Sequence, residues 1–165
     1  RRLSSAASDV YKRQFKTIAR VEQSVFAIMA PGHPLADSEK LSLSQCVEFP
    51  LALHDSSFSV GQHLGAQAHS SRLSLKPVIK SNSFILLQNY IMNSNAVGFE
   101  IEIGLSENDL NGLVKRPLTL NKLSKISVQL IQLRGRTLSV AAAKFAEQIG
   151  AVFMAMSVEN GDVIH

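Results

Sequence analysis

Short apolar runs that end in polar or turn-forming residues predict the strands of this chain. Residues 25–30 (VFAIMA) are apolar at every position and stop at Pro31, a pattern typical of a strand covered on both faces. Further runs of this kind are residues 51–54 (LALH), 77–80 (PVIK) and 96–101 (AVGFEI). The chain therefore contains the material of a buried sheet.

Apolar residues at helical spacing between these runs predict crossover helices. Residues 58–69 follow the polar turn Asp55–Ser57, whose side chains are good N-caps, and residues 84–92 follow the turn Ser81–Ser83. Two consecutive strand–turn–helix units that lead into a third strand indicate a mainly parallel sheet with right-handed crossovers. The pattern predicts an α/β fold. Asn95, just before the third strand, suits the left-handed conformation that ends a helix.

Further elements lie on either side of this α/β centre. Residues 41–49 predict a short helix, which ends before Pro50 because the residue preceding a proline avoids the helical conformation. Residues 112–118 (GLVKRPL) predict a short strand.

The last part of the chain predicts a strand and a helix. In residues 125–133 (KISVQLIQL) apolar and polar positions alternate, and the alternation slips at Leu130–Ile131, which indicates a bulge or a change of burial. Behind Ser139, residues 139–149 predict an amphipathic helix. Its apolar face comprises Ala142, Phe145, Ala146 and Ile149.

Composition limits what such a chain can be. Its 165 residues are 45% hydrophobic, enough for one domain or two small ones. The net charge of +4 comes from basic residues dispersed along the chain, so we do not expect them to bind nucleic acid. The single Cys46 cannot form an internal disulfide, which favours a reducing, cytoplasmic location.

The ends of the chain and its hydropathy add two expectations. Residues 1–14 have neither helical nor strand periodicity and are interpreted as a foreign or disordered leader. No apolar run approaches the roughly 18 residues of a membrane span, and the N-terminus lacks the features of a signal peptide. We therefore expect no membrane partner and no export.

The residues that invite a catalytic or metal site do not have the required spacing. His54, Asp55 and Ser56–Ser57 are adjacent in sequence, so they cannot align as base, orienting acid and nucleophile, and no nucleophile-elbow motif is present. The chain also lacks the glycine-rich motifs that bind nucleotides. Four histidines lack the i, i+4 pairing of a zinc site and are interpreted as surface or turn residues, so no cofactor and no metal are expected. They are His33, His54, His63 and His69.

Polar residues where the predicted parallel strands end are the best candidates for a ligand site. Ser81, Asn82 and Ser83 precede a helix, whose N-terminal N–H groups and dipole favour a carboxylate or phosphate. The simpler interpretation is an ordinary N-cap, worth roughly 1 kcal/mol. However, ligands of open α/β sheets lie outside the carboxyl ends of the strands, where Asp55–Ser57 and Glu100–Glu102 are also expected.

Several segments, in order, resemble the effector-binding domain of LysR-type transcriptional regulators over about Ala19 to Ile149. The most specific is VFAIMAPGHPLA, similar to the family's strand followed by a His-Pro-Leu-Ala turn. The other matching segments are LSLSQCVEFPLAL, SNSFILLQNYIMNSNAVGFEI, GLVKRPL and LRGRTLSVAAAKFAEQI.

The resemblance implies a fold like type 2 periplasmic binding proteins, with two α/β subdomains and a cleft for a small effector, commonly an organic anion or metabolite. Residues 48–122 are then the second subdomain, residues 15–47 and 123–150 a remnant of the first, and 151–165 a tail. The implied effector contacts are Ser81, Asn82 and Ser83, with Ser56, Ser57, Ala30, Pro31 and Glu100.

The resemblance also implies a role. No helix-turn-helix precedes the domain and the early elements of the first subdomain are absent, so the chain is interpreted as an N-terminally truncated, C-terminal part of a regulator. DNA would be bound only through the absent N-terminal domain, and the full-length protein is expected to be a homo-oligomer. A fragment of a periplasmic-type solute-binding protein and a small α/β enzyme stay as alternatives, both less favoured.

Overall fold

The structure is a computed structural model that describes residues 14–55, 58–105, 110–119 and 125–159. By its internal contacts the chain divides into two compact units. The first combines Arg1–Glu22 with Ser127–His165, and the second is Gln23–Ile126. Residues 23–47 thus group with the second unit; the subdomain boundaries implied by the resemblance stay a prediction.

The second unit is built on a mixed sheet. Its strands follow the spatial order β2-β6-β1-β5-β3-β4. The pairs β3–β4, β3–β5 and β2–β6 are parallel, whereas β1 is antiparallel to both β5 and β6. The strand bounds are β1 Phe15–Met29, β2 Leu41–Ser42, β3 Leu51–His54, β4 Pro77–Ser81, β5 Val97–Ile101 and β6 Val114–Thr119.

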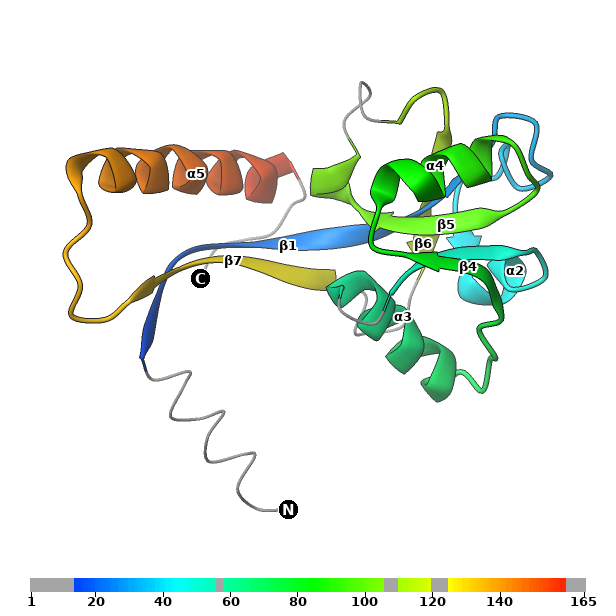
Figure 1. The fold of residues 1–165 in the computed structure, drawn as a ribbon, viewed down its shortest axis with the longest axis horizontal. Coiled ribbons are helices and arrows are strands. Elements are labelled where there is room, and N and C mark those ends of the chain that lie inside the picture. Colours follow the sequence, from blue (N-terminus) through cyan, green and yellow to red (C-terminus); the bar gives the residue numbers. More distant parts are fainter. Residues whose placement is uncertain (1–13, 56–57, 106–109, 120–124, 160–165) are drawn as a thin grey trace, which may run out of the picture. The chain divides into compact units, whose positions relative to one another are not determined.

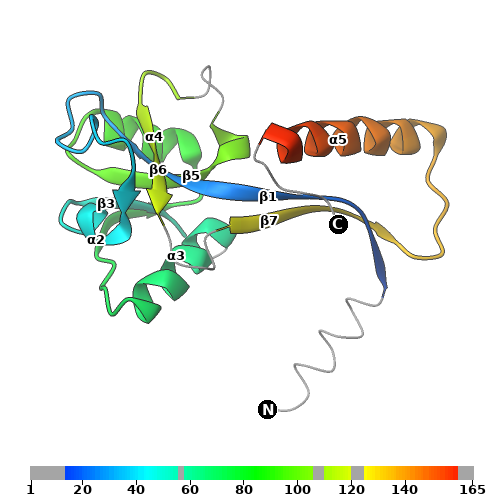
Figure 2. The same cartoon turned by 180° about the vertical axis from the view of Figure 1, so that it is seen from behind.

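Helices cover both faces of this sheet (Figure 1). On one face α3 (Ser59–Ser70) contributes Val60 and Leu64 to a core that includes Leu51, Leu53 and Val97. On the other face α4 (Phe84–Met92) contributes Leu87 and Ile91 to a second core with Ile28 and Ala52. The view from behind shows the same two layers around β3 and β5 (Figure 2). The predicted α/β fold is confirmed in this unit.

Short elements complete the second unit. The predicted helix in 41–49 is a single turn, α2 (Leu43–Cys46), where Ser42 Oγ accepts from Gln45 N and Ser42 N donates to Gln45 Oε1. A 3₁₀ turn, η1 (Glu102–Gly104), follows β5.

Two predicted helix ends differ from the structure. The N-cap of α3 is Phe58, with no side-chain cap hydrogen bond; instead, Phe58 N donates to Asp55 O at 3.2 Å. Helix α4 ends at Asn93 with φ −102°, and the non-glycine residues with positive φ in the described chain are Arg72 and Asn111. The prediction that Asn95 adopts the left-handed conformation was therefore wrong. The backbone N–H groups of Asn93 and Ser94 already donate to carbonyl groups in the last turn of the helix.

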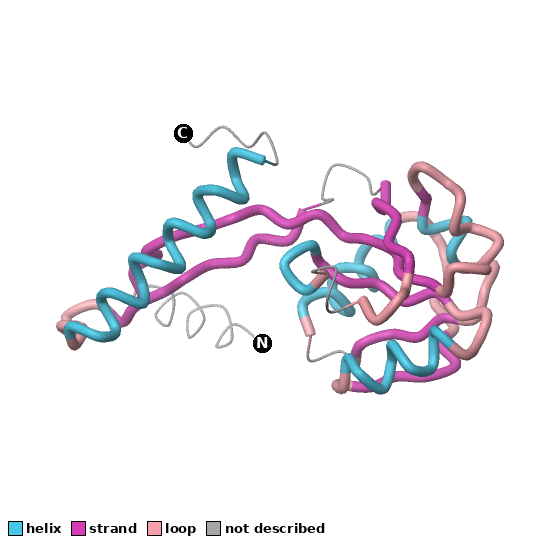
Figure 3. The backbone as a smooth tube through the Cα atoms, turned by 90° about the horizontal axis from the view of Figure 1, so that it is seen from above, coloured by secondary structure: helices cyan, strands magenta, loops and turns pink. Residues whose placement is uncertain are grey.

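The first unit contains the start of β1, paired with β7 (Lys125–Leu133), and α5 (Val140–Glu159), which Figure 3 shows lying along these strands. The helix follows Ser139 as predicted, and Ser139 caps it, since its Oγ accepts from Ala142 N at 3.3 Å. The helix runs ten residues beyond the predicted end at Ile149, to Glu159.

The buried face of α5 differs from the predicted one. Ala146, Phe153 and Ser157 are buried, whereas Ala142 and Phe145 are exposed. The change of burial predicted at Leu130–Ile131 is not found, because exposure alternates regularly along β7 and Ile131 lies on the exposed side. The hydrophobic pattern changes there because Ile131 and Leu133 occupy exposed positions.

Candidate functional site

The parallel strands of the second unit bring polar residues together at one edge of the sheet. His54 ends β3 and is the register partner of Ser81, which ends β4. The same register of β3 against β5, which pairs Ala52 with Gly98, continues to His54 and Glu100. The row Ser81–His54–Glu100 thus crosses the carboxyl edge of three neighbouring strands, where α/β proteins bind ligands.

His54 and Glu100 are joined by a hydrogen bond in this row. His54 Nε2 lies 2.9 Å from Glu100 Oε2, and the two side chains are 6% and 14% exposed. Glu100 Oε1 also accepts from Ile101 N at 2.9 Å. The carboxylate is therefore held on both oxygens, by a side chain and by its own strand.

Aromatic rings cover the imidazole of His54. Its centroid lies 4.9 Å from that of Phe58, the N-cap of α3, and 6.2 Å from that of Phe84, the first residue of α4. The other ring nitrogen, Nδ1, is buried, with no hydrogen-bond partner among the described residues. His54 thus links the starts of both helices to the carboxylate of β5.

The interpretation of the histidines as surface or turn residues was wrong for His54, which is buried at the end of β3. His33 is also buried. His33 Nδ1 accepts from Leu35 N and its ring packs against Phe49, which makes it a structural turn residue. Burial lowers the pKa of both His33 and His63.

The turn Ser81–Ser83 forms an N-cap in the structure. Ser83 Oγ accepts from Leu86 N at 3.3 Å, and Ser83 N donates to Ser81 Oγ at 3.0 Å. Asn82 and Ser83 are exposed, and Ser81 is half-buried. The cap is compatible with a ligand role. The side chains of Asn82 and Ser83 stay exposed at the start of α4, where the helix dipole favours an anion.

The structure separates other predicted contacts from this cluster. Since β1 is antiparallel to β5, with Ile28 opposite Gly98, the end of β1 at Ala30 and Pro31 lies at the other edge of the sheet. Ala30 O accepts from His33 N at 3.0 Å in the turn that follows, and Pro31 is exposed. Ser56 and Ser57 lie outside the described residues.

Antiparallel β1 instead brings Gln23 to the carboxyl edge. Its Oε1 accepts from Ile103 N at 2.7 Å, and the side chain is fully buried. Neither Gln23 nor the role of His54 was predicted from the sequence. No local signal reveals them, because their partners lie 80 and 46 residues away.

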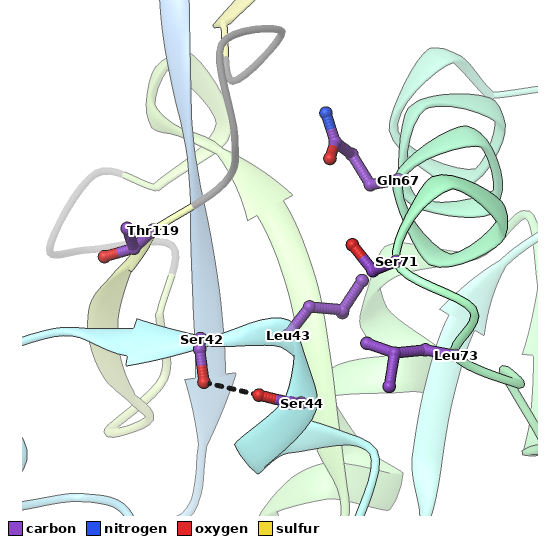
Figure 4. Close-up of a pocket in the computed structure, with 7 residues that line it drawn as sticks. All are labelled: Ser42, Leu43, Ser44, Gln67, Ser71, Leu73 and Thr119. Atoms are coloured by element: carbon purple, nitrogen blue, oxygen red, sulfur yellow. Dashed lines mark hydrogen bonds between the residues drawn. The ribbon is translucent and has the colours of Figure 1, made fainter.

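A pocket of about 310 Å³ lies elsewhere in the second unit (Figure 4). It opens between the start of α2, the end of α3 and β6, and the described residues that line it carry hydroxyl, amide and apolar side chains. Its residues are Ser42, Leu43, Ser44, Gln67, Ser71, Leu73 and Thr119. Because it lies at the end of α3 while His54 lies near the start of that helix, it is separate from the strand-end cluster.

Two further properties concern the described residues as a set. They contain no group of three or more His, Cys, Asp or Glu side chains able to hold a metal ion. None of the helices formed by them has both the length and the apolar character needed to cross a membrane.

The mixed sheet with helices on both faces, and with polar residues at the carboxyl edge of its parallel strands, is an α/β fold of the type 2 periplasmic-binding-protein class. The family described as LysR substrate binding domain matches residues 12–154, so the chain belongs to that family. It is a family of effector-binding regulatory domains and is non-enzymatic. The solute-binding protein and the enzyme are therefore set aside.

Solved structures share the fold at low sequence identity. The LysR family regulator HinK from Pseudomonas aeruginosa matches with a TM-score of 0.68 and 18% identity, over 85% of this chain and 50% of that one. The effector-binding domain of QuiR in complex with shikimate matches with a TM-score of 0.65 and 12% identity, over 86% and 68%. The CcmR regulatory domain from Synechocystis PCC6803, in complex with 2-PG, matches with a TM-score of 0.66 and 14% identity, over 84% of this chain and 66% of that one.

The chain spans about half the length of the HinK structure. A comparison with curated proteins found no match. At these identities the structural likeness shows the fold alone.

Proposed function

We propose that this chain senses a small organic anion at the carboxyl edge of β3, β4 and β5, as the effector-binding part of a LysR-type transcriptional regulator. The observation that carries the proposal is the row Ser81–His54–Glu100, because it places polar side chains from three strands beside the capped start of α4. Ser81, Asn82, Ser83 and Glu100 are its proposed contacts. Ser56, Ser57, Ala30 and Pro31 stay predictions.

Relatives support the class of ligand. The QuiR domain is in complex with shikimate and the CcmR domain with 2-PG. Both molecules are small anions, and the start of α4 offers N–H groups and a dipole that favour negative charge. We propose an effector of this size and charge for the present chain.

The proposed output is regulation of transcription in the cytoplasm. Effector binding would change the relative orientation of two subdomains and thereby the position of a DNA-binding domain, in a homo-oligomer. The chain itself would supply the sensing step.

Calorimetric titration tests the site. The probes are shikimate and 2-PG, followed by a panel of small carboxylates and phosphates. For a probe that binds, the double substitution Ser81→Ala and Ser83→Ala should weaken affinity at least tenfold, while the lost cap lowers the free energy of unfolding by about 1 kcal/mol.

Ser139→Ala is the matched control. It removes an N-cap of the same kind from α5, whose Ser139 Oγ accepts from Ala142 N. Its stability should fall by a similar amount while affinity is unchanged. Unchanged affinity in the Ser81/Ser83 variant would refute the proposed site, and equal loss of affinity in both variants would show that the effect is only structural.

A further inference from the structure

The carboxylate of Glu100 keeps unused capacity to accept hydrogen bonds. In the described structure it accepts from Ile101 N through Oε1 and meets His54 Nε2 through Oε2. An ionised carboxylate has about four lone-pair positions, so these two contacts leave room for more. Its side chain is 14% exposed, and part of it can therefore be reached from outside.

The environment of His54 favours one tautomer of its ring. Nδ1 is buried without a partner among the described residues, while Nε2 faces Glu100. A ring with protons on both nitrogens would bury an N–H group that has no acceptor among the described residues, which is unfavourable. The neutral tautomer with its proton on Nε2 fits the geometry, and in that tautomer His54 orients Glu100 without neutralising its charge.

Glu100 and the start of α4 lie along the carboxyl edge of the sheet and favour different ligand groups. Glu100 accepts hydrogen bonds, whereas the start of α4 offers N–H donors that favour an anion. Ser81, in the turn before α4, is the register partner of His54, and Glu100 stands beyond His54 on β5. Neighbouring strands are about 4.8 Å apart, so the backbones of β4 and β5 are separated by roughly 10 Å across β3. A small molecule with an anionic group at one end and a hydrogen-bond donor at the other can span this distance.

We infer that the effector carries a hydroxyl or ammonium group in addition to its anionic group, and that Glu100, positioned by His54, accepts a hydrogen bond from that donor. The inference rests on the proposed function and specifies the ligand class of the same site. A carboxylate without a donor would exclude water from the remaining acceptor positions of Glu100 without replacing its hydrogen bonds, and a second anionic group would be repelled by Glu100. Glu100 thus selects hydroxy acids or amino acids over simple and dicarboxylic acids.

Titration of the 165-residue chain with matched pairs of probes tests the inference. The pairs are shikimate and 1-cyclohexene-1-carboxylate, gluconate and hexanoate, and β-alanine and propionate, which differ in their hydroxyl or ammonium groups. At least one donor-bearing probe should bind tenfold or more tightly than its partner. Glu100→Gln should reduce that ratio to below threefold, whereas the exposed Glu48→Gln should leave it unchanged.

The positioning role of His54 is tested by the same ratio of affinities between the donor-bearing probe and its partner. A purely structural role of His54 would not change this ratio. His54→Leu removes the N–H donor that orients Glu100 and should lower the ratio, and His54→Gln, which retains an N–H donor, should restore part of it. Equal affinities within every pair for the wild-type chain, or an undiminished ratio in Glu100→Gln, would overturn the inference while the proposed function stands. Binding of no small anion at all, in these pairs or in the wider panel, would overturn both.

Discussion

Gly98 lies directly beneath Ile91, so that a β-carbon at position 98 would come within 2.5 Å of Ile91 Cδ1 and 3.1 Å of Ile28 Cγ1. Ile91 is fully buried in the core between α4 and the sheet, and its side chain has little freedom to move. We expect Gly98→Ala to lower the free energy of unfolding by about 1–3 kcal/mol, the usual cost of overpacking a core. Urea denaturation followed by circular dichroism measures this change.

Gly65 provides the control for that substitution. It lies within α3, where an added β-carbon meets no atom within 4 Å. Gly65→Ala should raise the stability by roughly 0.5–1 kcal/mol, because alanine loses less backbone entropy in a helix. Equal stability of Gly98→Ala and the wild type would show that α4 does not pack on β5 as described.

The buried Gln23 gives a prediction for the carboxyl edge of the sheet. Gln23→Leu removes the acceptor of the Ile103 N–H group, whose bond to Oε1 is 2.7 Å long. A hydrogen bond contributes about 0.5–1.5 kcal/mol to stability, so we expect a loss of that size and faster hydrogen exchange at Ile103. The exposed Gln148→Leu should change stability by less than about 0.5 kcal/mol. Unaltered exchange at Ile103 would mean that the bond contributes nothing.

Local sequence patterns predicted the elements of this fold well where apolar spacing and turn chemistry agree. The strand 51–54, the helix 84–92 and its Ser83 cap are found as expected. The buried face of α5 was misplaced because alanine and glycine line that helix on several sides. Packing against β1 decides which side is buried, and a β-carbon added at Gly150 would lie 3.9 Å from Ala19 Cβ.

The candidate site was only partly predictable for a different reason. Ser81 and Ser83 could be found because a polar turn before a helix is a local signal. The pairing of His54 with Glu100, and the position of Ala30 at the opposite edge, depend on the order and direction of strands far apart in the chain. The antiparallel β1 is the element that the expectation of a mainly parallel sheet did not include.

Cys46 should be unreactive in the folded protein. It is completely buried, and burial raises the pKa of its thiol from an ordinary value of 9.0 to about 12. At pH 8 the thiolate, which is the reactive form, is therefore roughly a thousandfold rarer than in the unfolded chain. Labelling by an aromatic disulfide reagent should be slow in buffer and fast in urea.

The same pKa shift predicts how stability depends on pH. The folded state holds its proton more tightly than the unfolded state, so this contribution to stability is fully present below pH 9 and decreases as the pH rises toward 12. Cys46→Ala should remove the part of the decrease in stability at alkaline pH that the thiol causes, and it should also cost some packing free energy. Rapid labelling of the native protein at pH 8 would contradict the described burial.

Hydrogen exchange should divide the chain according to how much apolar surface each unit buries within itself. In the second unit β3 and β5 lie between two buried clusters, and α4 packs on one of these clusters. In the first unit α5 leaves much of its apolar surface open, with Val140 87% and Phe145 62% exposed. Since segments with few buried contacts open at lower free energy, amides of β7 and α5 should exchange before those of β3, β5 and α4.

Mass spectrometry of peptides from exchange-labelled protein measures this order. Gly98→Ala adds a decisive comparison, because it weakens the core beneath α4 and should accelerate exchange in α4 and β5 with little change in α5. Overpacking acts only where the added methyl group has neighbours, and the described contacts of Gly98 all lie within the second unit. Protection of α5 equal to that of α4, or a parallel acceleration of both in the variant, would mean that the two units open together and that the apolar surface of α5 is covered in solution.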